Sequence, residues 1–109
     1  MNITENIDYI TKHLSEGDIL CQIAEEASEL AKAALKFKRA IEGTNPTPVT
    51  KKEAIENLVE EIADIELCLN IFSTKISDDF PYDLEEEIYT TKADRWCKRL
   101  KSAKGGDSE

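Results

Sequence analysis

The sequence predicts an all-α fold, a four-helix bundle with two long antiparallel central helices. Apolar residues recur at helical spacing through most of the chain, clusters of Gly, Pro, Asp and Ser separate these segments, and no alternating strand pattern competes with them. The 109 residues are enough to form one core. We therefore expect a single domain over residues 1–101 and a disordered C-terminal tail over residues 102–109, which has no apolar anchor.

The first half of the chain predicts a short helix and a long one. The short helix covers residues 4–14 and ends before Gly17, after which Asp18 is the candidate N-cap of the long helix. The long helix runs from Ile19 to about Glu42 and is amphipathic. Its apolar stripe consists of Leu20, Ile23, Ala24, Ala27, Leu30, Ala31, Ala34, Leu35 and Ile41. The segment 43–48, Gly-Thr-Asn-Pro-Thr-Pro, predicts a loop.

The second half begins with a capping box, because Thr50 is followed three residues later by Glu53. The third helix starts there and ends near residues 77–79. Its segment 62–72 is apolar on nearly all sides, which is typical of a helix covered by several neighbours, so we expect it at the centre of the fold. A fourth helix opens at residues 83–86 with acids in its first turn and carries basic residues in its last, as the helix dipole favours.

The charge and composition exclude several classes of function. The formal net charge is -9 and the isoelectric point is near 4.6, so the chain lacks the basic surface that binds nucleic-acid polymers. A nucleotide is still compatible, since a metal ion held by carboxylates can bind phosphates. The spacing of Cys21, Cys68 and Cys97 indicates neither a disulfide framework nor a zinc ribbon. With no apolar leader and no 18-residue apolar stretch, we expect a cytoplasmic protein without a membrane partner.

Two pairs of carboxylates stand out on the long helices. Glu26 lies beside the apolar stripe of the second helix and Glu29 lies across from it, a placement that also suits an ordinary solvated face. Glu61 and Asp64 stand three residues apart on an apolar face of the third helix, which has no Lys or Arg in residues 53–74. The other residues on that face are Leu58, Cys68 and Ile71. Ionised acids rarely occupy apolar surroundings without a compensating cation, so the second pair predicts a metal ion.

Antiparallel packing of the two long helices brings Glu26 and Glu29 to about the level of Glu61 and Asp64. Carboxylate ligands without histidine favour Mg²⁺, and Mn²⁺ can substitute. The single histidine, His13, is assigned to the surface or to the packing of the first helix. No Glu-x-x-His pair of the kind that builds a ferritin-like di-iron site is present.

Between Gln22 and Arg99 the chain resembles the MazG-like, all-α nucleoside triphosphate pyrophosphatases. The segments that carry the resemblance are QIAEEASELAKA, LVEEIADIELCLNIF and KADRWCKR, which contain the pattern EExxE followed by ExxD. The resemblance implies a helical bundle that completes its site by dimerising or by forming a dimer of dimers. It also implies Mg²⁺-dependent hydrolysis of a nucleoside triphosphate to the monophosphate and pyrophosphate by a metal-activated water.

The resemblance also implies roles for individual residues. The metal ligands are Glu26, Glu29, Glu61 and Asp64, and a carboxylate of this cluster, Glu26 or Glu29, is the catalytic base. Lys92 and Arg99 match basic positions that contact the triphosphate. Arg95 continues this basic face at helical spacing, which also suits an ordinary helix C-terminus. Phe37 is the best candidate to stack on the base, and Trp96 is a second candidate, although a single Trp on a helix is more often a packing anchor. Some relatives have Asn at the place of Trp96, so the identity of the base is not implied.

An alternative function from a different class is a non-catalytic, acidic helical interaction module that binds metal or nucleotide. A structural role without metal is a third reading, and it requires Glu61 and Asp64 to be solvated. We expect a homodimer or homotetramer, because the apolar surface of the third helix is incompletely covered within one chain. The sequence leaves open the base, the sugar and the biological role.

Overall fold

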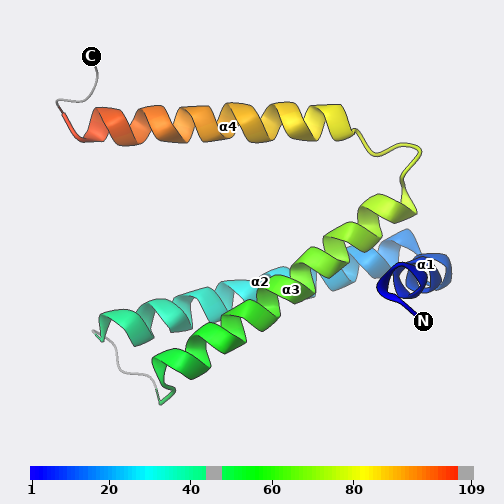
Figure 1. Cartoon of the computed structure of the whole chain (residues 1–109), viewed down its shortest axis with the longest axis horizontal. Coiled ribbons are helices and arrows are strands. Elements are labelled where there is room, and N and C mark those ends of the chain that lie inside the picture. Colours follow the sequence, from blue (N-terminus) through cyan, green and yellow to red (C-terminus); the bar gives the residue numbers. More distant parts are fainter. Residues whose placement is uncertain (44–47, 106–109) are drawn as a thin grey trace. The chain divides into compact units, whose positions relative to one another are not determined.

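The structure, a computed structural model, describes residues 1–43 and 48–105, and its regular elements are all helices (Figure 1). They are α1 (Ile3–His13), α2 (Glu16–Glu42), α3 (Lys51–Lys75) and α4 (Tyr82–Ala103). The prediction of an all-α chain with four helices is therefore confirmed for the described residues. The chain divides into two compact units, Met1–Ser77 and Asp78–Glu109.

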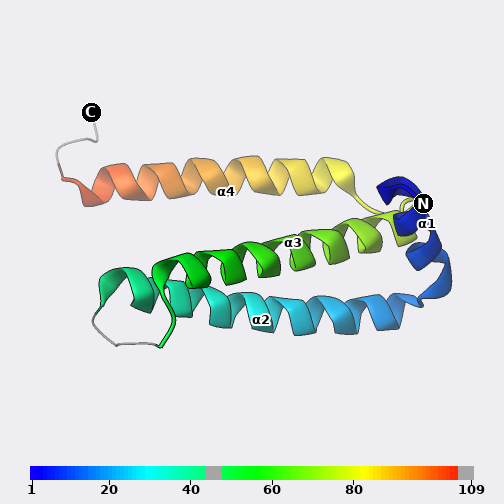
Figure 2. The same cartoon turned by 60° about the horizontal axis from the view of Figure 1, so that its bottom comes forward.

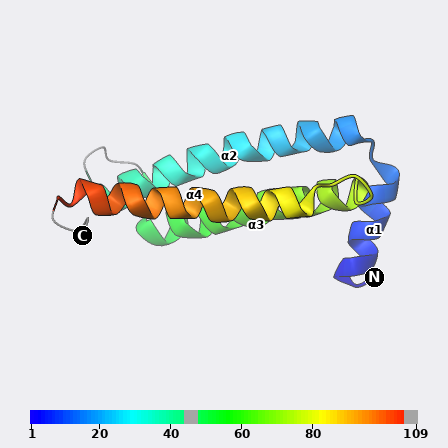
Figure 3. The ribbon, with the colours of Figure 1, turned by 90° about the horizontal axis from the view of Figure 1, so that it is seen from above.

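The first unit is built on an antiparallel hairpin of α2 and α3, which run side by side over most of their length (Figures 1 and 2). The short helix α1 crosses the end of this hairpin where α2 begins and α3 ends (Figure 3). A hydrogen bond ties α1 to that end, because Lys75 Nζ donates to the carbonyl oxygen of Thr11 at 2.9 Å.

Local capping sets most of the helix ends. The hydroxyl of Ser15 accepts a hydrogen bond from the Asp18 amide, so Ser15 is the N-cap of α2. The expected cap at Asp18 is wrong, because a helix tolerates Gly17 in its first turn once Ser15 caps it. At the other end Gly43 adopts the left-handed conformation with φ 69°, which favours glycine. Residues 44–47 of the predicted loop lie outside the described residues.

The predicted capping box of α3 is confirmed. Thr50 Oγ1 accepts from the Glu53 amide at 3.1 Å, and the Glu53 carboxylate accepts from the Thr50 amide at 3.0 Å. The helix ends at Lys75, earlier than the expected residues 77–79, with Ile76 as its C-cap.

The packed face of α2 differs from the predicted apolar stripe. Most buried and half-buried side chains on this helix follow spacings of four and three residues: Ile19, Ile23, Glu26, Leu30, Ala33, Phe37 and Ala40. Lys36 and Arg39 are also half-buried. Leu20, Leu35 and Ile41, which belonged to the predicted stripe, are 50%, 56% and 51% exposed. The stripe prediction is therefore wrong by about one residue step, and Glu26 lies within the face that packs on α3 rather than beside it.

The segment 62–72 of α3 is less covered than expected. Ile62, Leu67 and Leu69 are 39%, 40% and 49% exposed, although Ile71 is buried. Within Met1–Ser77, α3 packs against α2 along its length and against α1 at one end, so two of its flanks stay open. The other helices of Met1–Ser77 therefore do not enclose α3.

The second unit contains α4, which begins after Pro81 without a side-chain cap. It carries Asp83 and Glu85 in its first turn and Lys101 in its last, as predicted from the helix dipole. The helix continues to Ala103, so the tail expected from residue 102 starts later, and residues 106–109 lie outside the described part of the chain. Among the described residues no helix is both long and apolar enough to cross a bilayer.

Candidate metal centre

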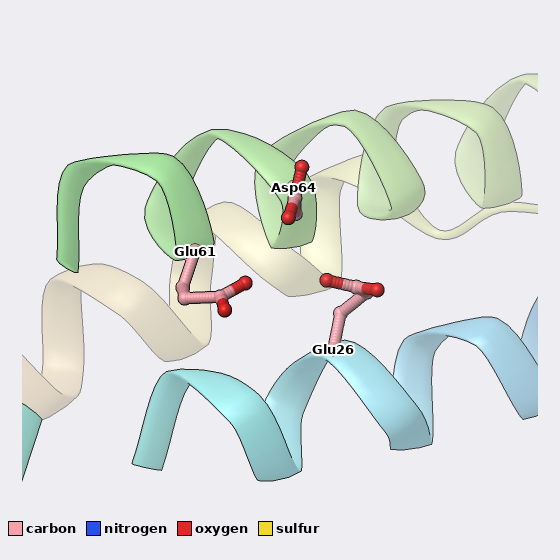
Figure 4. A group of neighbouring side chains, drawn as sticks. All are labelled: Glu26, Glu61 and Asp64. Atoms are coloured by element: carbon pink, nitrogen blue, oxygen red, sulfur yellow. The ribbon is translucent and has the colours of Figure 1, made fainter. Parts of the chain in front are cut away.

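Three carboxylates from two helices meet near the middle of the hairpin. Glu26 reaches from α2 toward α3, while Glu61 and Asp64 reach from α3 toward α2 (Figure 4). Each side chain offers one oxygen, and these three oxygens all lie within 4.8 Å of one another. All three residues are half-buried, so the cluster belongs to the packed face of the hairpin rather than to its outer surface.

The position of the cluster follows from the packing of α2 on α3. The buried residues Ile19 and Ala33 stand seven residues before and after Glu26, about 10 Å away along the helix in each direction. On α3 the buried residues Ala54 and Ile71 stand on either side of Glu61 and Asp64. Apolar contacts at both ends therefore fix the two helices together and hold the carboxylates between them.

The electrostatics of the cluster disfavour three free negative charges. Desolvation raises the pKa of Glu26, and the charge of Asp64 raises it further. Desolvation is also the largest cause that raises the pKa of Glu61, followed by a hydrogen bond and the charge interaction with Asp64. Among the residues that the structure describes, no Lys or Arg forms an ion pair with any of the three carboxylates. Protonation of a carboxylate or binding of a cation would relieve this repulsion.

Two further side chains lie beside the cluster. Gln22 Nε2 donates to Glu26 Oε1 at 3.1 Å, which holds that carboxylate and partly offsets the rise in its pKa. Cys68, expected on the same face as Glu61 and Asp64, is half-buried one turn after Asp64, and burial followed by the charges of Glu26 and Asp64 raises the pKa of its thiol. Gln22 was not singled out from the sequence, although its spacing of four residues from Glu26 would have identified it.

Glu29, the fourth predicted ligand, lies one turn after Glu26 but outside the group of three. Its side chain is 48% exposed and accepts a hydrogen bond from Lys32 Nζ at 3.2 Å. The charge of Glu29 nevertheless acts on the cluster, because it is one of the causes that raise the pKa values of Glu26 and Glu61. A role for Glu29 as ligand or base stays a prediction.

The predicted substrate-binding residues fall into two groups. Lys92, Arg95, Trp96 and Arg99 all lie on α4 and are exposed. Phe37 lies on α2, half-buried on the same face as Glu26 but about 16 Å further along the helix. That position favours a packing role for Phe37 over stacking on a base near the carboxylates.

The three carboxylates fit a hard divalent cation. In an octahedral Mg²⁺ site with bonds of about 2.1 Å, neighbouring ligand oxygens are about 3 Å apart and opposite ones about 4.2 Å apart. The three oxygens, all within 4.8 Å of one another, are close to these separations. Three protein ligands leave three positions for water and phosphate oxygens, which Mg²⁺ commonly keeps. His13 stacks on Tyr9 in α1 and is not part of the cluster.

Comparison with protein-family models, with curated proteins and with solved structures finds no match.

Proposed function

We propose that this protein is a metal-dependent nucleoside triphosphate pyrophosphohydrolase with Glu26, Glu61 and Asp64 as ligands of a divalent cation, Mg²⁺ in the first place. The observation that carries the proposal is the convergence of these three half-buried carboxylates with no partner cation among the described residues. Glu29 is the proposed fourth ligand, and Mn²⁺ is the proposed substitute metal. The choice of reaction rests on the resemblance of the EExxE and ExxD segments to the MazG-like enzymes.

In the proposed reaction one water cleaves the anhydride bond between the α- and β-phosphates, which yields a nucleoside monophosphate and pyrophosphate. When bound, the cation supplies charge neutralisation for the phosphates and makes water a better nucleophile. Glu26 or Glu29 accepts the proton that the water loses.

The exposed cations of α4 are the proposed contacts to the triphosphate. Lys92, Arg95 and Arg99 follow one another at spacings of three and four residues, so they share one side of the helix. Trp96 is 63% exposed and is available to stack on a base. Their positive charges would balance part of the charge of a bound triphosphate.

The experiment is a pyrophosphate-release screen over canonical and modified nucleoside triphosphates, with and without Mg²⁺. The decisive variant is Asp64→Asn, and Glu60→Gln is its matched control, since Glu60 is an exposed carboxylate four residues earlier on the same helix. Metal-dependent release by the wild type and the control, with none by Asp64→Asn, supports the proposal. A complete absence of metal-dependent turnover overturns it. Nucleotide binding without turnover would instead identify the non-catalytic interaction module.

A further inference from the structure

An amide side chain of α2 contacts one of the three carboxylates of the cluster. Gln22 Nε2 donates a hydrogen bond to Glu26 Oε1 at 3.1 Å, across one turn of the helix. Gln22 is exposed and Glu26 is half-buried, so the bond lies at the edge of the face that packs on α3. Residues four apart on a helix are neighbours on its surface, and Gln22 therefore reaches this carboxylate without any change in the backbone.

The same carboxyl group faces α3 on its other side. Figure 4 shows Glu26 extending from α2 toward the helix that carries Asp64. After desolvation, the charge of Asp64 and a hydrogen-bond contact between the two carboxyl groups raise the pKa of Glu26, so the two groups are direct neighbours. Gln22 and Asp64 thus contact the Glu26 carboxyl group from two different helices, and together they limit how far it can turn.

The bond from Gln22 restricts the ways in which Glu26 can bind a cation. A carboxylate binds a cation through one oxygen or through both, and the two-oxygen mode requires both atoms to face the ion. The hydrogen bond engages one of the two oxygens and sets the orientation of the carboxylate, which favours the one-oxygen mode. Loss of the bond would allow the side chain to turn and to offer both oxygens.

Mg²⁺ and Ca²⁺ differ in the carboxylate ligands that they accept. Mg²⁺ requires nearly octahedral geometry with bonds of about 2.1 Å, which suits carboxylates that bind through one oxygen each. Ca²⁺ takes roughly six to eight oxygen ligands in variable geometry and often binds a carboxylate through both oxygens. Selectivity between the two ions depends on the number and the flexibility of the ligands, so a bond that fixes one carboxylate in the one-oxygen mode favours Mg²⁺.

We propose that Gln22 is a positioning residue that makes the carboxylate cluster selective for Mg²⁺ over Ca²⁺, because it keeps Glu26 a ligand through one oxygen. This inference rests on the proposed function and names the residue that sets the preference of its metal centre among divalent cations. Side chains that hydrogen-bond to metal ligands orient them, and removing such a partner typically weakens metal binding by about 10- to 100-fold. Here the loss should fall on Mg²⁺, since Ca²⁺ gains the second oxygen that Gln22 releases.

The test is isothermal titration calorimetry of the full-length, metal-free protein with Mg²⁺ and with Ca²⁺, in the absence of nucleotide. Gln22→Met removes the donor and keeps the length and the helix propensity of the side chain. The ratio of the Mg²⁺ affinity to the Ca²⁺ affinity should fall by about tenfold or more in this variant. Lys38→Met is the matched control, because it removes another exposed bond across one turn of α2, from Lys38 to Glu42 at 2.8 Å. It lies about 18 Å along the helix from Glu26 and should keep the wild-type ratio.

The affinity ratio separates an orienting role from a merely structural one. A loosened hairpin would weaken the binding of both ions alike and lower the metal-free melting temperature, whereas Gln22→Met should melt close to the wild type because Gln22 is exposed. An unchanged ratio in Gln22→Met, or a ratio that falls only together with a large loss of melting temperature, overturns the role of Gln22 and leaves the metal centre in place. A wild type that binds Ca²⁺ at least as tightly as Mg²⁺ does the same. A wild type that binds neither ion overturns this inference together with the proposed function.

Discussion

Mg²⁺ should stabilise the folded protein, and Asp64→Asn should remove that effect. A cation that binds only the folded state at about ten times its dissociation constant contributes roughly 1.4 kcal/mol. For a unit the size of Met1–Ser77, each kcal/mol raises the melting temperature by about 4–8 °C, so we expect a rise of roughly 6–11 °C. Without metal, Asp64→Asn should melt above the wild type, because the charge of Asp64 raises the pKa values of Glu26 and Glu61.

The assay is thermal unfolding followed by circular dichroism at pH 7, with MgCl₂ compared against KCl of equal ionic strength. Glu60→Gln is the control, since it removes one exposed carboxylate of α3 and should keep the full response to Mg²⁺. An equal response in Asp64→Asn and the wild type would show that the ion acts elsewhere. No response of the wild type to either Mg²⁺ or Mn²⁺ would refute the metal centre itself.

Three further predictions concern acidity, capping and packing. In metal-free protein, the free energy of unfolding should rise as the pH falls from neutral toward 4.5, the ordinary pKa of glutamate, because the folded state raises the pKa values of Glu26 and Glu61 above it. Urea unfolding measured across this pH range checks the rise, and Glu61→Gln should flatten it. Below 4.5 stability should fall again, since the capping box lowers the pKa of Glu53. Thr50→Ala should cost about 1 kcal/mol and lower the melting temperature by about 4–8 °C, and an unchanged melting temperature would contradict the cap. Phe37→Ala should cost about 2 kcal/mol in urea unfolding, roughly half the cost at a fully buried site, while KM for the triphosphate stays constant. A raised KM with unchanged stability would instead support base stacking.

The features set by local interactions could be predicted from the sequence. The capping box at Thr50 and Glu53 and the left-handed Gly43 depend on residues within one turn, and both are confirmed. The pairing of Glu61 with Asp64 on one face follows from helical spacing alone, and the structure brings Glu26 to the same place.

The direction in which α2 packs could not be predicted in the same way. Periodicity averages over all apolar residues of a helix, and α2 carries two apolar stripes one residue apart. The stripe through Leu20 and Ala27 is apolar from Leu20 to Ala34, whereas the stripe that packs on α3 contains Glu26. The average therefore favoured the exposed stripe. The composition of one helix does not reveal that a charged residue lies in its packed face.

The small apolar core and the carboxylates in the packed face both limit the stability of the α2–α3 hairpin. Among the described residues, the only buried ones are Ile19, Ala33, Ala54 and Ile71, which is a small core for helices of this length. Between these apolar contacts stand carboxylates that repel one another, so the packed face contributes less stability than an all-apolar one would. The proposed cation would add stability at this point of the hairpin, so the protein should unfold more readily without metal than with it.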